Sequence, residues 1–182
     1  IRAGSLSSFP SDLTNINGTL YFTANDGTSG IELWKSDGTE AGTAFVKDIR
    51  GGSSSSSPRL LTNMNGTLYF TATDGTSGEE LWKSDGTETG TARVKDITAG
   101  SLSSSPSYLT NVNGTLYFRG FDSTNGGELW KSDGTEAGTI LVKDIRGGIG
   151  TAFPRHLTNV DGTLYFSATD GTSGYELWKS DG

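Results

Sequence analysis

The chain has 182 residues, of which 14 are basic and 21 acidic, and its formal net charge is −7. This negative balance opposes binding to a phosphate backbone or an anionic membrane surface, so nucleic acid is not an expected partner. No run approaches the roughly 18 consecutive apolar residues of a membrane span, so membrane insertion is not expected. The absence of cysteine excludes disulfides and thiolate metal sites.

The chain is built from a repeat whose most distinctive stretch, at residues 32–43, reads Glu-Leu-Trp-Lys-Ser-Asp-Gly-Thr-Glu-Ala-Gly-Thr. The tryptophan of this stretch recurs every 48 residues without insertion or deletion. The 27 glycines and the low hydrophobic fraction of 32% are typical of short strands joined by tight turns. We therefore expect an all-β chain that forms a single repeat domain over residues 1–182.

Each repeat is predicted to contain four strands. A Gly/Ser-rich stretch ending in Pro, residues 2–10 in the first repeat, predicts a defined crossing between repeats. Next, the pair Asn17-Gly18 separates two β-prone runs and predicts a type I′ hairpin, because both central residues of that turn need a positive φ. The second, third and fourth strands of the first repeat are expected at residues 19–24, 32–36 and 43–49.

Alternation along the strands puts large apolar groups on both faces of this sheet. Leu20 and Phe22 point to one face and Tyr21 to the other, and Leu33 opposes Trp34 in the third strand. A four-stranded antiparallel sheet that needs covering on both faces is typical of a β-propeller blade. The blades are expected at approximately 9–49, 57–97, 105–145 and 153–182. A structural role between blades is expected for Trp34, Trp82, Trp130 and Trp178.

The fourth blade is predicted to lack its outer strand. Four complete units would need 192 residues, ten more than the 182 present. The strand at Glu176–Ser180 would then have an unpaired edge, which invites pairing. Three arrangements remain open: a four-bladed ring with one trimmed blade, half of a larger ring closed by a second copy, or a segment of a longer propeller. A homo-oligomer is therefore one expected partner.

The repeated Glu-Leu-Trp-Lys-Ser-Asp-Gly-Thr resembles the ELWxxDGT repeat family of bacterial proteins, and the resemblance covers essentially the whole chain. It implies propeller-like repeats in large secreted or surface-attached proteins. It thereby implies an extracellular or cell-surface location. The family offers no agreed catalytic chemistry to carry over.

One aspartate per repeat lies in the loop between the second and third strands. A ring of such loops could hold Ca²⁺, but calcium takes about 6 to 8 oxygen ligands and no loop has alternating carboxylates. The favoured interpretation is a turn-forming Asp that accepts hydrogen bonds from the loop backbone. No cofactor is expected, with Ca²⁺ as the alternative. The weak metal candidates are Asp26, Asp74, Asp122 and Asp170.

Catalytic groups are sparse in the sequence. There is no cysteine and no Gly-x-Ser-x-Gly, and His156 is the only imidazole available as a base. Glu32 and its counterparts in the other repeats could act as acid/base carboxylates. We expect them instead to pair with neighbouring lysines such as Lys35.

Differences between the repeats indicate a candidate binding face formed by Tyr108, Arg155, His156, Tyr175 and Arg59. The expected function is that of a non-enzymatic secreted or cell-surface module for adhesion or assembly, which binds carbohydrate or a surface protein. The alternatives are a glycan-active hydrolase-like propeller and a Ca²⁺-stabilised, lectin-like propeller. A hydrolase would need a cluster of unlike polar residues that breaks the repeat symmetry near the channel. The polar residues of this chain recur almost uniformly.

Overall fold

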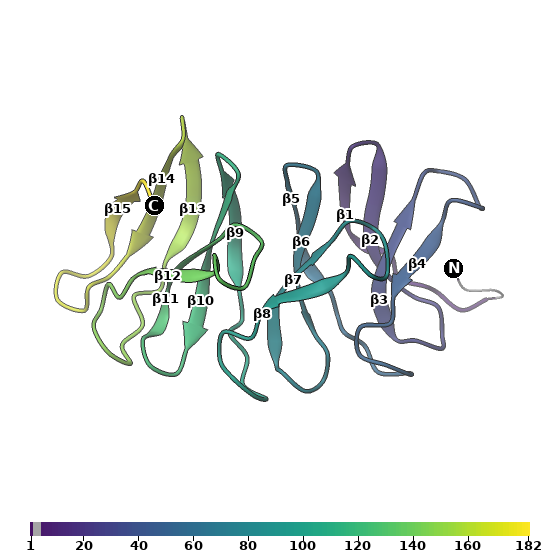
Figure 1. Cartoon of the computed structure of the whole chain (residues 1–182), viewed down its shortest axis with the longest axis horizontal. Coiled ribbons are helices and arrows are strands. Elements are labelled where there is room, and N and C mark those ends of the chain that lie inside the picture. The colour runs from purple at the N-terminus through teal and green to yellow at the C-terminus, as the bar shows by residue number, and fades with distance from the viewer. Residues whose placement is uncertain (2–4) are drawn as a thin grey trace.

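The computed structural model describes residue 1 and residues 5–182, in which all regular secondary structure is β-strand. The strands form four antiparallel sheets, one per repeat, that follow one another along the chain (Figure 1). The predicted all-β fold of propeller blades is therefore confirmed. The predicted crossing at residues 2–10 falls partly on residues 2–4, which lie outside the described part. No helix in the described part is long and apolar enough to span a membrane.

The strands have similar bounds in every repeat. The first sheet comprises β1 (Ser11–Ile16), β2 (Thr19–Asn25), β3 (Ile31–Ser36) and β4 (Ala44–Lys47). The second comprises β5 (Arg59–Met64), β6 (Thr67–Thr73), β7 (Glu79–Ser84) and β8 (Ala92–Lys95). The third comprises β9 (Ser107–Val112), β10 (Thr115–Asp122), β11 (Gly126–Ser132) and β12 (Ile140–Lys143). The fourth comprises β13 (Arg155–Val160), β14 (Thr163–Ala168) and β15 (Glu176–Ser180).

The first strand of each blade lies on the inner side of the array. Within each sheet the strands are hydrogen-bonded in chain order, and contacts between blades join β1 to β5, β5 to β9 and β9 to β13. Figure 1 shows the four sheets in a row with the N- and C-termini at opposite ends. The described blades form an open array. The closed four-bladed ring, one of the three expected arrangements, is therefore wrong.

The first hairpin of each blade has the predicted turn chemistry. Asn17 and Gly18 have φ values of 52° and 87°, as a type I′ turn requires. The side-chain oxygen of Asn15 accepts a hydrogen bond from the Gly18 N–H at 3.0 Å. The same positive φ pair occurs in the other three repeats, at Asn65-Gly66, Asn113-Gly114 and Asp161-Gly162.

Neighbouring blades are held together by their apolar faces. At the first junction, Tyr21 and Leu33 of the first blade belong to one buried cluster with Phe70 and Trp82 of the second. The same face-to-face arrangement recurs at the second and third junctions. Phe22, which follows Tyr21 in β2, lies in a different cluster. The predicted two-faced blade is therefore confirmed, and each interior blade is covered on both sides by its neighbours.

The fourth blade differs from the others at its outer edge. Its sheet has three strands, with β15 at the margin, as the sequence predicts. Leu177 on β15 is 77% exposed, whereas its counterpart Leu81 on β7 is fully buried. The face of the fourth blade that corresponds to a buried junction elsewhere is thus open to solvent.

The crossings between blades approach the preceding hairpin loop closely. Gly78 in the second blade has a φ of 69°, and a Cβ atom placed there would lie 2.5 Å from the carbonyl oxygen of Leu102 in the next crossing. Gly174 is its counterpart in the fourth blade. It has a φ of 76°, but nothing lies within 4 Å of its Cβ position.

We expect Gly78→Ala to lower the free energy of unfolding by about 2–4 kcal/mol, because the methyl group adds a steric clash to an unfavourable backbone conformation. Gly174→Ala is the matched control. It should cost only about 1 kcal/mol, because it shares the backbone conformation without the clash. Urea denaturation of both variants measures the difference. Equal losses would show that the close approach to Leu102 contributes nothing.

Candidate functional site

The recurring glutamate of the third strand is a buried structural group in the first three blades. Glu80 is fully buried, and its Oε1 accepts a hydrogen bond from the backbone N–H of Ser104 at 2.9 Å. Its Oε2 accepts from the Ile97 N–H at 3.2 Å and from the Ser104 hydroxyl at 2.5 Å. Glu32 accepts bonds from the corresponding groups of the first crossing. Each carboxyl group therefore holds both ends of the crossing that leads to the next blade.

The expected pairing of these glutamates with lysines is wrong. Lys83, three residues after Glu80, extends to the next blade and donates a hydrogen bond to the carbonyl of Gly134 at 2.8 Å. Within the described residues, all ion pairs involve Arg59 or Arg93. The lysines therefore bind backbone carbonyls across the junctions, and the glutamates bind backbone N–H groups.

Burial changes the protonation of these carboxyl groups. It raises the pKa of Glu32 to about 6 and the pKa values of Glu80 and Glu128 to about 7, above the ordinary value of 4.5, although their hydrogen bonds act in the opposite direction. Such values suit a general acid or base. These side chains lie inside the blades, however, and their oxygens already bind the crossings, so they are not available to a substrate.

The loop aspartates form the predicted turns. Oδ1 of Asp26 accepts hydrogen bonds from the N–H groups of Thr28 and Ser29 at 2.8 and 2.7 Å, and the other three repeats show the same pattern. Bonds from the backbone N–H groups of Thr172 and Ser173 lower the pKa of Asp170 to about 2. Among the described residues, no three His, Cys, Asp or Glu side chains are grouped so as to hold a metal ion.

The repeated tryptophans are packing residues in this structure. Trp82 and Trp130 lie in the buried clusters of the first and second junctions, and both are 6% exposed. Trp178 in the fourth blade is partly buried, and its indole N–H donates to the carbonyl of Ala168 at 3.0 Å. A sugar ring has no access to the faces of the two interior tryptophans.

A backbone irregularity presents one variable side chain per blade on the inner strands. The pairing of β9 with β10 shifts register next to Tyr108, and that of β13 with β14 shifts next to His156. Tyr108 and His156 have positive φ values of 58° and 56°, as do their counterparts in the other two blades. A bulge of this kind re-aims the side chain that it carries. It is occupied by Asp12, Leu60, Tyr108 and His156 in the four repeats.

The structure brings most of the predicted binding face together. The rings of Tyr108 and His156 meet edge to face with centroids 6.2 Å apart. The guanidinium of Arg155 lies over the Tyr175 ring at 5.4 Å and over the Phe153 ring at 5.6 Å. These contacts link the third and fourth blades through a cluster of arginine and aromatic side chains.

Arg59 stands apart from this cluster. Its guanidinium forms an ion pair with Glu79 at 2.6 Å, which neutralises its charge. Arg155 and Tyr175 occupy the same two positions in the fourth repeat. The third repeat has Ser107 and Gly127 at these positions, and Gly127 lines a hollow.

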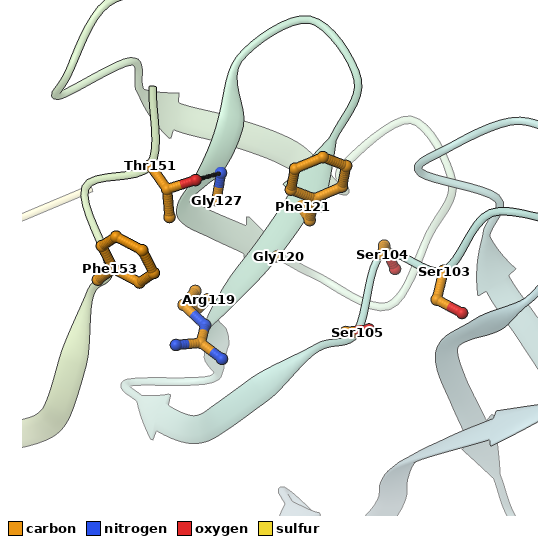
Figure 2. Close-up of a pocket in the computed structure, with 9 residues that line it drawn as sticks. All are labelled: Ser103, Ser104, Ser105, Arg119, Gly120, Phe121, Gly127, Thr151 and Phe153. Carbon is orange, nitrogen blue, oxygen red and sulfur yellow. Dashed lines mark hydrogen bonds between the residues drawn. The ribbon is translucent and has the colours of Figure 1, made fainter. Parts of the chain in front are cut away.

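That hollow has a volume of about 290 Å³ and is lined by Arg119, Phe121, Gly127, Thr151 and Phe153, with Ser103–Ser105 and Gly120 (Figure 2). A Cβ atom on Gly127 would lie 2.5 Å from the Thr151 side chain, so a larger residue here would push against this wall of the hollow. Arg119 also borders a second hollow of about 430 Å³ that contains Tyr108. Its guanidinium lies over the Tyr108 ring at 5.6 Å.

Arg119 is the residue that the sequence analysis missed. Its counterparts are Thr23, Thr71 and Ser167, small hydroxyl residues that bond within their own blades. Arg119 and Arg155 form no ion pair with any described residue. The sequence signal for Arg119 was that this position departs from the other three repeats. Phe121 is a second departure nearby, because the other repeats have Asn or Thr there. The repeat symmetry is therefore broken at the inner face, contrary to the near-uniform polar pattern inferred from the sequence.

No family model matches the chain, and no curated protein matches its sequence. Its fold is similar to that of solved hydrolases. A prolyl endopeptidase matches 90% of this chain with a TM-score of 0.52 and 14% identity. A puromycin hydrolase matches 96% with a TM-score of 0.55 and 14% identity. The chain spans about a quarter of the length of each, 25% and 27% respectively.

A weaker similarity joins the chain to an α-L-arabinofuranosidase from Clostridium thermocellum. The match covers 95% of this chain and 68% of the arabinofuranosidase, with 19% identity and a TM-score of 0.43. All three proteins are enzymes. The expectation of a non-enzymatic module is contradicted, because the solved proteins that share the fold with TM-scores above 0.5 are hydrolases.

Replacement of Glu80 by Gln tests the role of the buried carboxyl group. The folded chain holds the Glu80 proton more tightly than the unfolded chain. This contribution to the free energy of unfolding is therefore fully present below about pH 4.5 and is lost as the pH rises toward 7. We expect Glu80→Gln to cost about 1–3 kcal/mol near pH 4.5, because its amide N–H₂ faces a backbone donor. The cost should be smaller near pH 8.

The matched control is Glu176→Gln, since Glu176 is the counterpart of Glu80 in the fourth blade and is exposed. Urea denaturation of the wild type and both variants at the two pH values measures the effect. The control variant should unfold like the wild type at both. A Glu80→Gln cost that does not change with pH would contradict the raised pKa of the buried group.

Proposed function

We propose that the chain is the propeller part of a glycan-acting hydrolase and that the hollow at Arg119 binds an acidic sugar unit of the glycan. The observation that carries the proposal is the guanidinium of Arg119, which lies over the Tyr108 ring and has no ion-pair partner among the described residues. The other three repeats have a small hydroxyl residue at this position. The fold similarity to hydrolases is consistent with it.

The chemistry of the hollow favours an anionic sugar. A guanidinium binds a carboxylate through two parallel hydrogen bonds, which supports a uronic acid over a neutral sugar. Phe121 is 40% exposed and Tyr108 38%, so both present ring surface on which the apolar face of a sugar can stack. The net charge of −7 disfavours anion binding over most of the surface, so the positive charge at Arg119 is a local exception.

The proposed role of the hollow is binding. Glycoside hydrolysis generally uses two carboxyl groups on either side of the scissile bond, and the residues that line the hollow include no Asp or Glu. We therefore assign to the Arg119 hollow the positioning of the glycan and leave the acid and base to other residues of the enzyme. An extracellular or cell-surface location agrees with this substrate class and stays a prediction.

Arg119→Thr installs the residue of the first two repeats and removes the positive charge. We expect it to weaken binding of an oligouronide by roughly 10- to 100-fold, because a charge-assisted hydrogen bond contributes about 1.5–3 kcal/mol. Isothermal titration calorimetry with an oligogalacturonide measures the effect. A neutral xylo-oligosaccharide and an acidic peptide serve as comparison ligands, and a parallel titration with EDTA tests the Ca²⁺ alternative.

The matched control is Arg50→Thr, which makes the same charge change in the first crossing, where the counterpart Thr98 occupies the second. Arg50 is exposed and lies outside the hollow. This variant should bind the oligouronide like the wild type. Three results would refute the proposed function: no oligouronide binding, equal binding by the Arg119 variant, or preference for the acidic peptide.

A further inference from the structure

A further hollow adjoins the Arg119 hollow on the side of the second blade. It has a volume of about 260 Å³, and we call it the Glu79 hollow. Residues of the second and third blades line it, among them Arg59, Thr71, Glu79, Ser105, Ser107 and Arg119. Ser105 and Arg119 line both hollows, and both residues are labelled in Figure 2. The two hollows are therefore adjacent compartments that meet at Arg119.

The Glu79 side chain is held in place at the wall of this hollow. Its Oε1 accepts hydrogen bonds from the Arg59 guanidinium at 2.6 Å and from the hydroxyl of the buried Thr71 at 3.0 Å. The backbone of Glu79 is fixed as well, since its N–H donates to the Ser103 hydroxyl at 2.9 Å and its carbonyl accepts from the Ser105 N–H at 3.2 Å. Within the described residues, Oε2 of Glu79 accepts no hydrogen bond. One carboxylate oxygen is thus anchored and the other is available to a ligand.

The ion pair of Arg59 and Glu79 occurs in the second repeat alone. The residues at these two positions are Ser11 and Ile31 in the first repeat, Ser107 and Gly127 in the third, and Arg155 and Tyr175 in the fourth. The same blade architecture therefore forms without the pair in three of the four repeats. The pair is not needed to build a blade, which favours a role toward a ligand.

An arginine beside a glutamate is suited to a pair of neighbouring sugar hydroxyl groups. The guanidinium donates hydrogen bonds and the free carboxylate oxygen accepts them, and a hydroxyl group can do both. The two opposite charges compensate each other, so the pair offers no net attraction to an anion. A ligand carboxylate in this hollow would also lie beside Oε2 of Glu79, where like charges repel. The Glu79 hollow therefore favours a neutral sugar.

The charges of the two hollows taken together lead to the same conclusion. Among the residues that line them, Arg59, Arg119 and Glu79 carry a charge. Arg59 is compensated by Glu79, so the guanidinium of Arg119 is the one charge left for a ligand. The two compartments therefore match one carboxylate and not two.

We propose that the two hollows bind neighbouring units of one glycan, an acidic sugar in the Arg119 hollow and a neutral sugar in the Glu79 hollow. The ligand is then a glycan in which acidic and neutral sugars are linked, and a homopolymer of uronic acid is the poorer ligand. Leu60 is 44% exposed and lines the Glu79 hollow, where it offers apolar surface to the face of the neutral ring. This second binding site rests on the proposed function, because both sites share Arg119. Its role is binding, since one carboxyl group does not form the pair that glycoside hydrolysis generally uses.

Isothermal titration calorimetry of the wild type with two tetrasaccharides tests this site. One alternates galacturonic acid with rhamnose, a neutral sugar, and the other is tetragalacturonate. We expect the alternating tetrasaccharide to bind roughly 10-fold more tightly, because the homopolymer places a second carboxylate beside Glu79. Equal affinities, or tighter binding of tetragalacturonate, would overturn the neutral-sugar site, and this comparison requires no variant.

Glu79→Gln tests the residue that makes the discrimination. The glutamine keeps the size of the side chain and an oxygen that can accept from Thr71, but it removes the negative charge. Tetragalacturonate should bind this variant roughly 10-fold more tightly than it binds the wild type, so that the preference is lost. Glu88→Gln is the matched control, because Glu88 belongs to the same blade, is exposed and lines neither hollow. It should keep the wild-type preference, and a Glu79→Gln variant that also keeps it would contradict the role of Glu79.

Arg119→Thr distinguishes a failure of the neutral-sugar site from a failure of the proposed function. This variant should weaken the binding of both tetrasaccharides, whereas Glu79→Gln should change their ratio. If both bind the wild type equally and Arg119→Thr weakens both, the acidic-sugar site stands and the neutral-sugar site is refuted. If neither tetrasaccharide binds the wild type, the proposed function and the neutral-sugar site are both refuted.

Discussion

The buried carboxyl group at the start of each third strand is the constraint on which the array depends. Backbone N–H groups buried without an acceptor would destabilise the fold. The crossing must therefore follow the path that brings its N–H groups to Glu80, and this path sets where the next inner strand begins. The position of that strand in turn decides which variable side chains meet across a junction. Ser104, which Glu80 holds in place, also lines the hollow at Arg119, so this contact positions one wall of the hollow.

The sequence predicts the fold well because its signals are local and repeated. The Asn17-Gly18 turn, the alternation around Phe22 and the 48-residue period each report on neighbouring residues. The role of Glu80 is not local. Its main partner, Ser104, lies 24 residues further along the chain. A glutamate close to a lysine in sequence predicts an exposed ion pair, because only the folded structure brings the crossing back to Glu80.

Only part of the candidate site could be predicted from the sequence, for a similar reason. Variation between repeats marks Tyr108 and His156, whose bulged strands place them on one face. Arg119 lies on the second strand, where a small hydroxyl residue normally bonds within its own blade. The importance of this exchange depends on the empty space beside Arg119, which Gly127 lines in the same blade. Such a hollow depends on how strands and crossings pack together, so the sequence of one strand does not predict it.

The buried carboxyl groups of the first three blades have a consequence for how these blades hold together. In a repeat protein, stability is close to a sum of the terms for each unit and its nearest neighbours. The first three blades each bind the crossing that follows them, so loosening one blade weakens the next. Cooperativity is therefore directional among these blades, because each carboxyl group couples its own blade to the one that follows it.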